Sequence, residues 1–122
     1  MSSEFEIIND ILIVKISGEV DHHSVSKARG EIDCNYIASG CRHIVFDFSQ
    51  VSFADSSGIA LIIGRYNITK EEGGTLVITG CHKLLEKILE MAGVFTIIKK
   101  LNSNIDAIKY IKYIEEGTDN EE

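Results

Sequence analysis

The chain has 122 residues, of which 44% are hydrophobic and 25% charged, and this suits one compact domain large enough to bury a core. Its formal net charge of -7 argues against nonspecific binding to nucleic acid or to an anionic membrane, because both require a positively charged surface. No apolar stretch approaches the ~20 residues of a membrane-spanning helix, and the acidic N-terminus lacks the basic and apolar regions of a signal peptide. We therefore expect the protein to stay in the cytoplasm.

The first part of the chain predicts a β-hairpin followed by a helix. Two runs rich in β-forming residues, 4–8 and 11–17, are separated by Asn9 and Asp10, a pair that tolerates a positive φ and suits a tight turn. Apolar residues then recur at spacings of three and four, which predicts a helix over 22–38.

Strands and helices alternate through the rest of the chain. The short apolar run HIVFDF, 43–48, predicts a strand covered on both faces, at the centre of the sheet. The spacing of apolar residues predicts the other elements, which are helices over 57–70, 82–92 and 103–115 and strands over 75–79 and 95–98. Strands joined by single helices form right-handed crossovers, so we predict an α/β fold with a mixed, mostly parallel sheet of about five strands and about four helices.

The end of the chain differs in composition from the rest. The residues EEGTDNEE, from 115 onward, are polar and almost free of apolar side chains, which is typical of a flexible segment. We expect a single domain over 1–115 and an acidic, flexible tail over 116–122.

The most distinctive local sequence is FADSSGIA, 53–60, which lies where the central strand gives way to a helix. A helix N-terminus has free N–H groups and the positive end of the helix dipole, so it can tolerate an added phosphate. Asp55, Ser56 and Ser57 are each able to cap this helix, although one cap needs only one such residue. Asp55 can therefore hold the turn while a serine faces outward for modification. From these residues alone, simple capping by any of the three remains open.

The same stretch also resembles the nucleophile elbow of serine hydrolases. Ala54, Ser56 and Gly58 occupy alternate positions at a strand-to-helix turn. The only histidine after Ser56 is His82, at the start of an apolar helix, and the chain has no glycine-rich oxyanion loop. We expect no catalytic residue. A small hydrolase is the competing class of function, and it would be supported by ester turnover that Ser56→Ala abolishes.

No metal site is expected. His22 and His23 are neighbours, so in a helix their side chains point about 100° apart and do not share a face. Cys34, Cys41 and Cys81 are an odd number without CxxC spacing, which indicates free, mostly buried thiols to which we assign no function.

Three stretches carry a resemblance to the STAS domain of anti-sigma factor antagonists, and most closely to its sporulation-type members. They are SGEVDHHS at 17–24, RHIVFDFSQVSFADSSGIALIIGRY at 42–66 and GGTLVITGCHKLLEKILEMAGVFTII at 73–98, and the resemblance extends over about 5–114. It implies a protein that is not an enzyme. Its unphosphorylated form would bind an anti-sigma factor serine kinase and so release the sigma factor. The alternative is a STAS-type regulator in a general stress circuit with a different serine kinase.

The resemblance also implies roles for single residues. The first serine of the motif, Ser56, would be phosphorylated by the kinase, and a separate serine phosphatase would restore the active form. ATP or ADP would lie in the kinase, so we expect no cofactor for this chain. We expect Ser57 to help complete the helix start, and Gly58 to let the partner approach the backbone. The expected partner-binding residues are Gly18, Asp21, His22, Asp55, Ser57 and Gly58.

Overall fold

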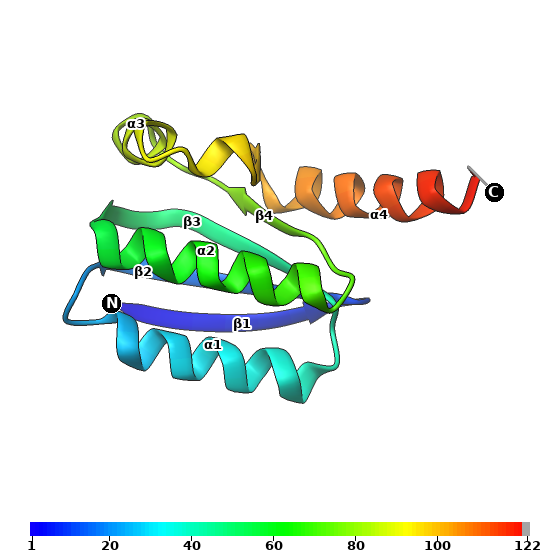
Figure 1. Cartoon of the computed structure of the whole chain (residues 1–122), viewed down its shortest axis with the longest axis horizontal. Coiled ribbons are helices and arrows are strands. Elements are labelled where there is room, and N and C mark those ends of the chain that lie inside the picture. The colour runs from blue at the N-terminus through cyan, green and yellow to red at the C-terminus, as the bar shows by residue number, and fades with distance from the viewer. Residues whose placement is uncertain (121–122) are drawn as a thin grey trace.

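A computed structural model describes residues 1–120, with side chains as far as 117, as an α/β domain built on one five-stranded sheet. Its elements are β1 (Ser2–Ile8), β2 (Ile11–Val20), α1 (Val25–Ser39), β3 (His43–Ala54), α2 (Ser56–Glu71), β4 (Leu76–Thr79), α3 (Lys83–Met91), a 3-10 turn (Val94–Thr96), β5 (Lys99–Leu101) and α4 (Asn104–Asn120). The strand order is β1-β2-β3-β4-β5. Only β1 is antiparallel to its neighbour, so the predicted mixed, mostly parallel sheet is confirmed (Figure 1).

The predicted N-terminal hairpin and the central strand are both confirmed. Ile8 pairs with Ile11 across a two-residue turn in which Asn9 has a φ of 53°. Asn tolerates this left-handed backbone better than most residues because its short polar side chain bonds locally. β3 lies in the middle of the strand order, and all but one of the residues 43–48 are buried.

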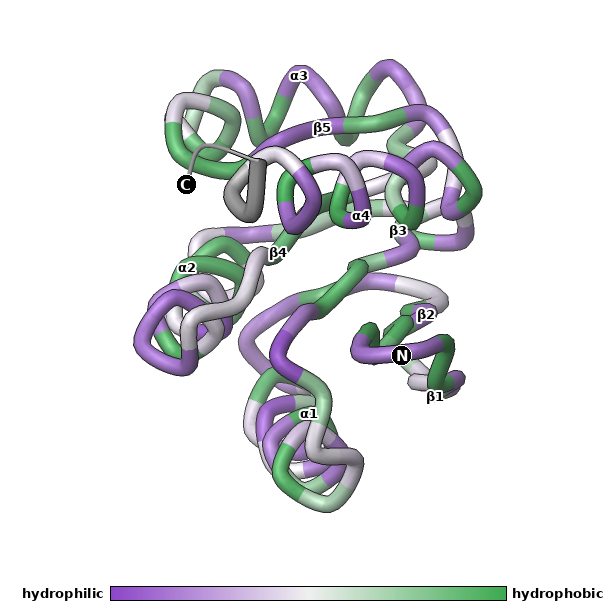
Figure 2. The backbone as a smooth tube through the Cα atoms, turned by 90° about the vertical axis from the view of Figure 1, so that its right-hand side faces the viewer, coloured by the Kyte–Doolittle hydropathy of each residue, from purple (hydrophilic) through white to green (hydrophobic). Residues whose placement is uncertain are grey.

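The two faces of the sheet are covered by different helices. Successive residues of β2 and β3 point to opposite faces, so both strands contribute to two hydrophobic clusters. α1, α2 and α3 pack on one face and α4 packs on the other, and hydrophobic and hydrophilic residues alternate along these helices in Figure 2. The first cluster includes Leu12, Val14, Ala28, Ile32, Phe46, Leu61, Ile62, Leu85 and Leu89, and the second includes Ile11, Ile13, Val45, Val77, Ala107 and Ile111.

Within the described residues, no helix combines the length and the apolar content that crossing a membrane requires.

The predicted strand over 95–98 is wrong. Val94–Thr96 forms a 3-10 turn, and the last strand follows it at Lys99–Leu101, where it pairs with β4. Val94 and Ile98 are both buried, and they lie four residues apart, as on a turn of helix. Val94 and Ile98 therefore pack into the core from a turn, while the ladder is made by the more polar residues that follow.

Other boundaries also differ from the predictions. The helix predicted over 22–38 begins at Val25, because residues 22–24 form a turn. β2 and β3 extend to Val20 and Ala54, beyond the predicted ends at 17 and 48, because their last residues continue to pair with each other. α4 continues to Asn120, so the predicted tail over 116–122 is helical that far, and residues 121–122 lie outside the described residues. The flexibility of this tail stays a prediction.

Candidate functional site

The topology brings the two most distinctive loops of the sequence together. β2 and β3 are parallel neighbours, and Val20 pairs with Ala54 at their carboxyl ends. The loop of residues 21–24, which follows β2, therefore lies beside the start of α2, which follows β3 (Figure 1). The N–H of Asp55 donates a hydrogen bond to the Val20 carbonyl at 3.3 Å, which joins the two segments directly.

Asp55 holds both loops with one carboxylate. Its Oδ1 accepts hydrogen bonds from the N–H groups of Ser57 (2.9 Å) and Gly58 (3.1 Å), as an N-cap residue does. Its Oδ2 accepts a hydrogen bond from the His22 N–H at 3.0 Å. These bonds, with that from Gly58 the largest contribution, hold the pKa of the Asp55 carboxyl below its ordinary value of 3.8.

We predict that Asp55 stabilises the fold only while it is ionised. A carboxyl with a lowered pKa in the folded state contributes stability above its unfolded pKa, and this contribution is lost as the pH falls through the folded pKa. The wild-type chain should be more stable than Asp55→Asn at neutral pH, and the difference should shrink below about pH 4. Urea unfolding at several pH values measures it.

A matched control for this prediction is Asp106→Asn, which changes an exposed residue in the first turn of α4. This substitution should cost little at any pH. An equal difference between wild type and Asp55→Asn at pH 7 and pH 3 would show that the charge of Asp55 does not stabilise the loops.

The two serines differ in exposure. Ser56 is exposed and Ser57 is half-buried. The expectation that Asp55 holds the turn while a serine faces outward is confirmed, because Asp55 caps α2 and Ser56 is exposed. Asp55 is the N-cap of α2, and Ser57 takes part through its N–H, so a role of the Ser57 hydroxyl at the helix start stays a prediction.

The loop of residues 21–24 is held by its own side chains. Asp21 Oδ1 accepts hydrogen bonds from the Ser24 N–H (3.1 Å) and the Ser24 hydroxyl (3.0 Å). His22 is exposed, while Gly18 lies before the loop at a register shift between β2 and β3, with a φ of 93°. Asp21 and His22 thus lie at the same edge as Ser56, and Gly18 shapes the strand that leads there. Partner binding by these residues stays a prediction.

Gly58 faces the ends of β2 and β3. It is buried, and a Cβ atom at this position would lie 2.4 Å from the Val20 carbonyl oxygen and 3.3 Å from the Ala54 Cβ. The expectation that Gly58 leaves room for a partner's approach is therefore wrong. The missing side chain instead lets α2 begin directly against the ends of β2 and β3.

A groove between α1 and α2 was not predicted. Arg65 lies on the inner face of α2, three and four residues after the buried Ile62 and Leu61, and it is buried itself. The helical spacing places Arg65 on the apolar face of α2, so the sequence contains a signal for a buried charge. It does not show that Arg29 of α1 lines the same cavity.

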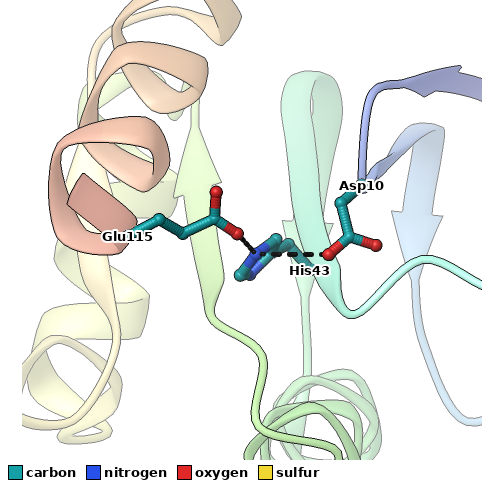
Figure 3. A group of neighbouring side chains, drawn as sticks. All are labelled: Asp10, His43 and Glu115. Atoms are coloured by element: carbon teal, nitrogen blue, oxygen red, sulfur yellow. Dashed lines mark hydrogen bonds and ion pairs between the residues drawn. The ribbon is translucent and has the colours of Figure 1, made fainter. Parts of the chain in front are cut away.

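One cluster consists of residue types that often bind metal ions, but both ring nitrogens of its histidine are already hydrogen-bonded. Asp10, His43 and Glu115 lie together at the other end of the sheet (Figure 3). His43 Nδ1 accepts a hydrogen bond from the Thr75 N–H at 3.0 Å, so the proton of a neutral ring lies on Nε2. Nε2 then donates to Glu115 Oε1 at 2.6 Å and has no free lone pair for a metal ion. The cluster ties α4 to the start of β3.

Comparisons with known proteins agree with this fold. The family model of the STAS domain matches residues 2–108. An anti-sigma F factor antagonist of Paenibacillus polymyxa is 31% identical over 111 residues, covering 91% of this chain and 95% of that protein. An anti-sigma-B factor antagonist of Bacillus subtilis is 28% identical over 90 residues, covering 74% and 80%. The unphosphorylated form of the anti-sigma factor antagonist SpoIIAA superposes with a TM-score of 0.71 at 22% identity, covering 91% and 98%.

Proposed function

The chain belongs to the STAS domain family, and we propose that within it the protein is an anti-sigma factor antagonist controlled by phosphorylation of Ser56. In this proposal the unphosphorylated form binds a cognate anti-sigma factor serine kinase in the cytoplasm and releases the sigma factor. The kinase then phosphorylates Ser56, and a serine phosphatase reverses the modification. ATP or ADP belongs to the kinase, and the antagonist itself has no cofactor and no catalytic activity.

The observation that carries this proposal is the position of Ser56. Its side chain is exposed at the first residue of α2, beside a turn that Asp55 holds through three hydrogen bonds. A kinase can therefore reach the hydroxyl without unfolding the helix. No hydrogen bond joins Ser56 to an imidazole in the part of the chain that the structure describes, so a hydrolase with an activated serine is not favoured.

A phosphate at this position would act mainly on the partner. The N–H groups of Ser57 and Gly58, which are the donors expected to bind a phosphate at the helix start, already donate to Asp55. The added charge of about -1.5 to -2 would thus stand in solvent beside the Asp55 carboxylate. An interface that covered it would have to desolvate it next to a like charge, which is costly.

The general stress circuit remains the second candidate because of the Bacillus subtilis relative named an anti-sigma-B factor antagonist. The Paenibacillus polymyxa relative, named an anti-sigma F factor antagonist, is covered over a larger share of its length and is more similar. This favours the first circuit. The identity of the kinase that binds the chain distinguishes the two.

Incubation of the purified protein with ATP and the anti-sigma factor kinases of the same organism tests the proposal. Mass spectrometry should find one phosphate, on Ser56, and none on the Ser56→Ala variant. Ser57→Ala is the matched control and should still be phosphorylated, because Asp55 caps the helix without the Ser57 hydroxyl. Phosphate on Ser57, or on neither serine with kinases that modify another antagonist, would contradict the proposal.

A further inference from the structure

A groove with two arginines lies beside the proposed phosphorylation site. α1 and α2 leave a cavity of about 320 Å³ between them, lined by residues that include Arg29, Ser57, Gly64 and Arg65. Ser57 is the neighbour of Ser56, so this groove opens on the same part of the surface as the proposed switch.

The Arg65 guanidinium is unusual because it is buried without a full set of partners. Only 8% of its side chain is exposed, and its Nε lies 3.1 Å from Asp33 Oδ1. Its Nη1 is buried, and no residue that the structure describes gives it a hydrogen-bond partner. Burial lowers the pKa of Arg65, Asp33 opposes this effect and Arg29 adds to it. Arg29, which lines the same groove, thus adds a second guanidinium group near Arg65.

Buried polar groups in proteins are nearly always hydrogen-bonded, so an unpartnered guanidinium nitrogen on a residue that lines a cavity indicates a missing acceptor. The acceptor should be an anion, because one positive charge at the groove is not balanced by Asp33. Guanidinium groups bind carboxylates with paired hydrogen bonds. The apolar side chains of Ala60 and Leu61, which also line the cavity, suit the methylene groups of a glutamate.

We propose that this groove receives an acidic side chain of the anti-sigma factor kinase, an inference that rests on the proposed function. Charge complementarity favours a protein carboxylate. The chain as a whole carries a net charge of -7 and would repel an acidic residue elsewhere, whereas the two arginines of the groove beside Ser56 would attract it to one defined place. Gly64 lines the groove, and a Cβ atom there would meet nothing within 4 Å, so the absence of a side chain at this position leaves the groove open.

Two substitutions test the groove, each with a matched control, by calorimetric titration with the kinase. Arg29→Glu reverses an exposed charge at the groove and should weaken binding by about 10–100-fold. Lys27→Glu makes the same change on α1 outside the groove and should bind within about threefold of wild type. Gly64→Leu fills the groove and should weaken binding by more than about 10-fold, whereas Gly30→Leu should not.

Thermal unfolding shows whether a variant that binds the kinase weakly is still folded. At Gly64 and Gly30 an added Cβ meets no described atom within 4 Å outside its own stretch of helix, and leucine favours a helix over glycine, so we expect both leucine variants to unfold no earlier than wild type. A glutamate-to-lysine or aspartate-to-lysine variant of the kinase that restores binding to Arg29→Glu would identify the docked residue and support the inference.

The outcomes separate this inference from the proposed function. If the wild-type chain binds the kinase and both groove variants bind equally well, the groove inference is wrong and the proposed function stands. If the wild-type chain binds none of the organism's anti-sigma factor kinases, both are wrong. If inorganic phosphate stabilises wild type but not Arg29→Glu while kinase binding is unchanged, the groove takes a small anion and the inference is overturned.

Discussion

Phosphorylation of Ser56 is expected to weaken binding of the chain to its anti-sigma factor kinase by about 10³ to 10⁴-fold, since a switch between 1:99 and 99:1 occupancy requires about 5.5 kcal/mol. The phosphate would lie at the start of α2, beside the Asp55 carboxylate and close to the loop that contains Asp21. A tight interface would have to remove water from these like charges together. Because Ser56 is exposed, the folded chain should lose little stability.

Titration of the kinase with the purified phosphorylated and unphosphorylated forms measures this effect. Asn67→Asp is the matched control, because it adds a negative charge to an exposed position of the same helix about three turns from Ser56. It should change affinity by less than about threefold. A phosphorylated form that binds as tightly as the unphosphorylated one, or a control that binds as weakly as the phosphorylated form, would show that the position of the charge does not control the partner.

The site was partly predictable because its main features are local. Asp and Ser are strongly preferred at helix starts, so the sequence DSSG predicts a cap and an exposed hydroxyl without knowledge of the rest of the fold. The pairing of this stretch with the loop at 21–24 follows from the parallel neighbours β2 and β3, which the alternation of strands and helices predicts. The structure adds the hydrogen bond from the His22 N–H to Asp55, which a sequence pattern does not specify.

The errors arose where tertiary contacts decide the outcome. Ile98 belongs to a short apolar run that fits a strand, but it is buried together with Val94 from a turn, so core packing determined that segment. Arg65 has an ordinary helix propensity, and only the packing of α1 against α2 places it in a cavity with Arg29. Gly58 was interpreted from its neighbours in the chain, whereas the atom that matters, the Val20 carbonyl oxygen, lies 38 positions earlier and across the sheet edge.

Gly58→Ala is expected to destabilise the chain by about 2 kcal/mol or more. An alanine Cβ would lie 2.4 Å from the Val20 carbonyl oxygen, and 3.1 Å from Val20 Cγ1, so the start of α2 must move away from the end of β2. Alanine in a helix normally gains about 0.5–1 kcal/mol over glycine, so the measured loss is smaller than the clash itself. Urea unfolding of the variant and the wild-type chain measures the difference.

Gly64→Ala, in the same helix, separates the two effects because an added Cβ there meets nothing within 4 Å. It should stabilise the chain by about 0.5–1 kcal/mol through helix propensity alone. If both alanine variants are stabilised, then α2 does not need glycine to approach β2, and the described geometry at Gly58 is wrong. If only Gly58→Ala is destabilised, the close approach is real. The N–H of Gly58 also donates to Asp55, so a shift of Gly58 in the alanine variant should weaken the hydrogen bond from the His22 N–H to Asp55. Gly58→Ala should therefore weaken kinase binding as well as stability.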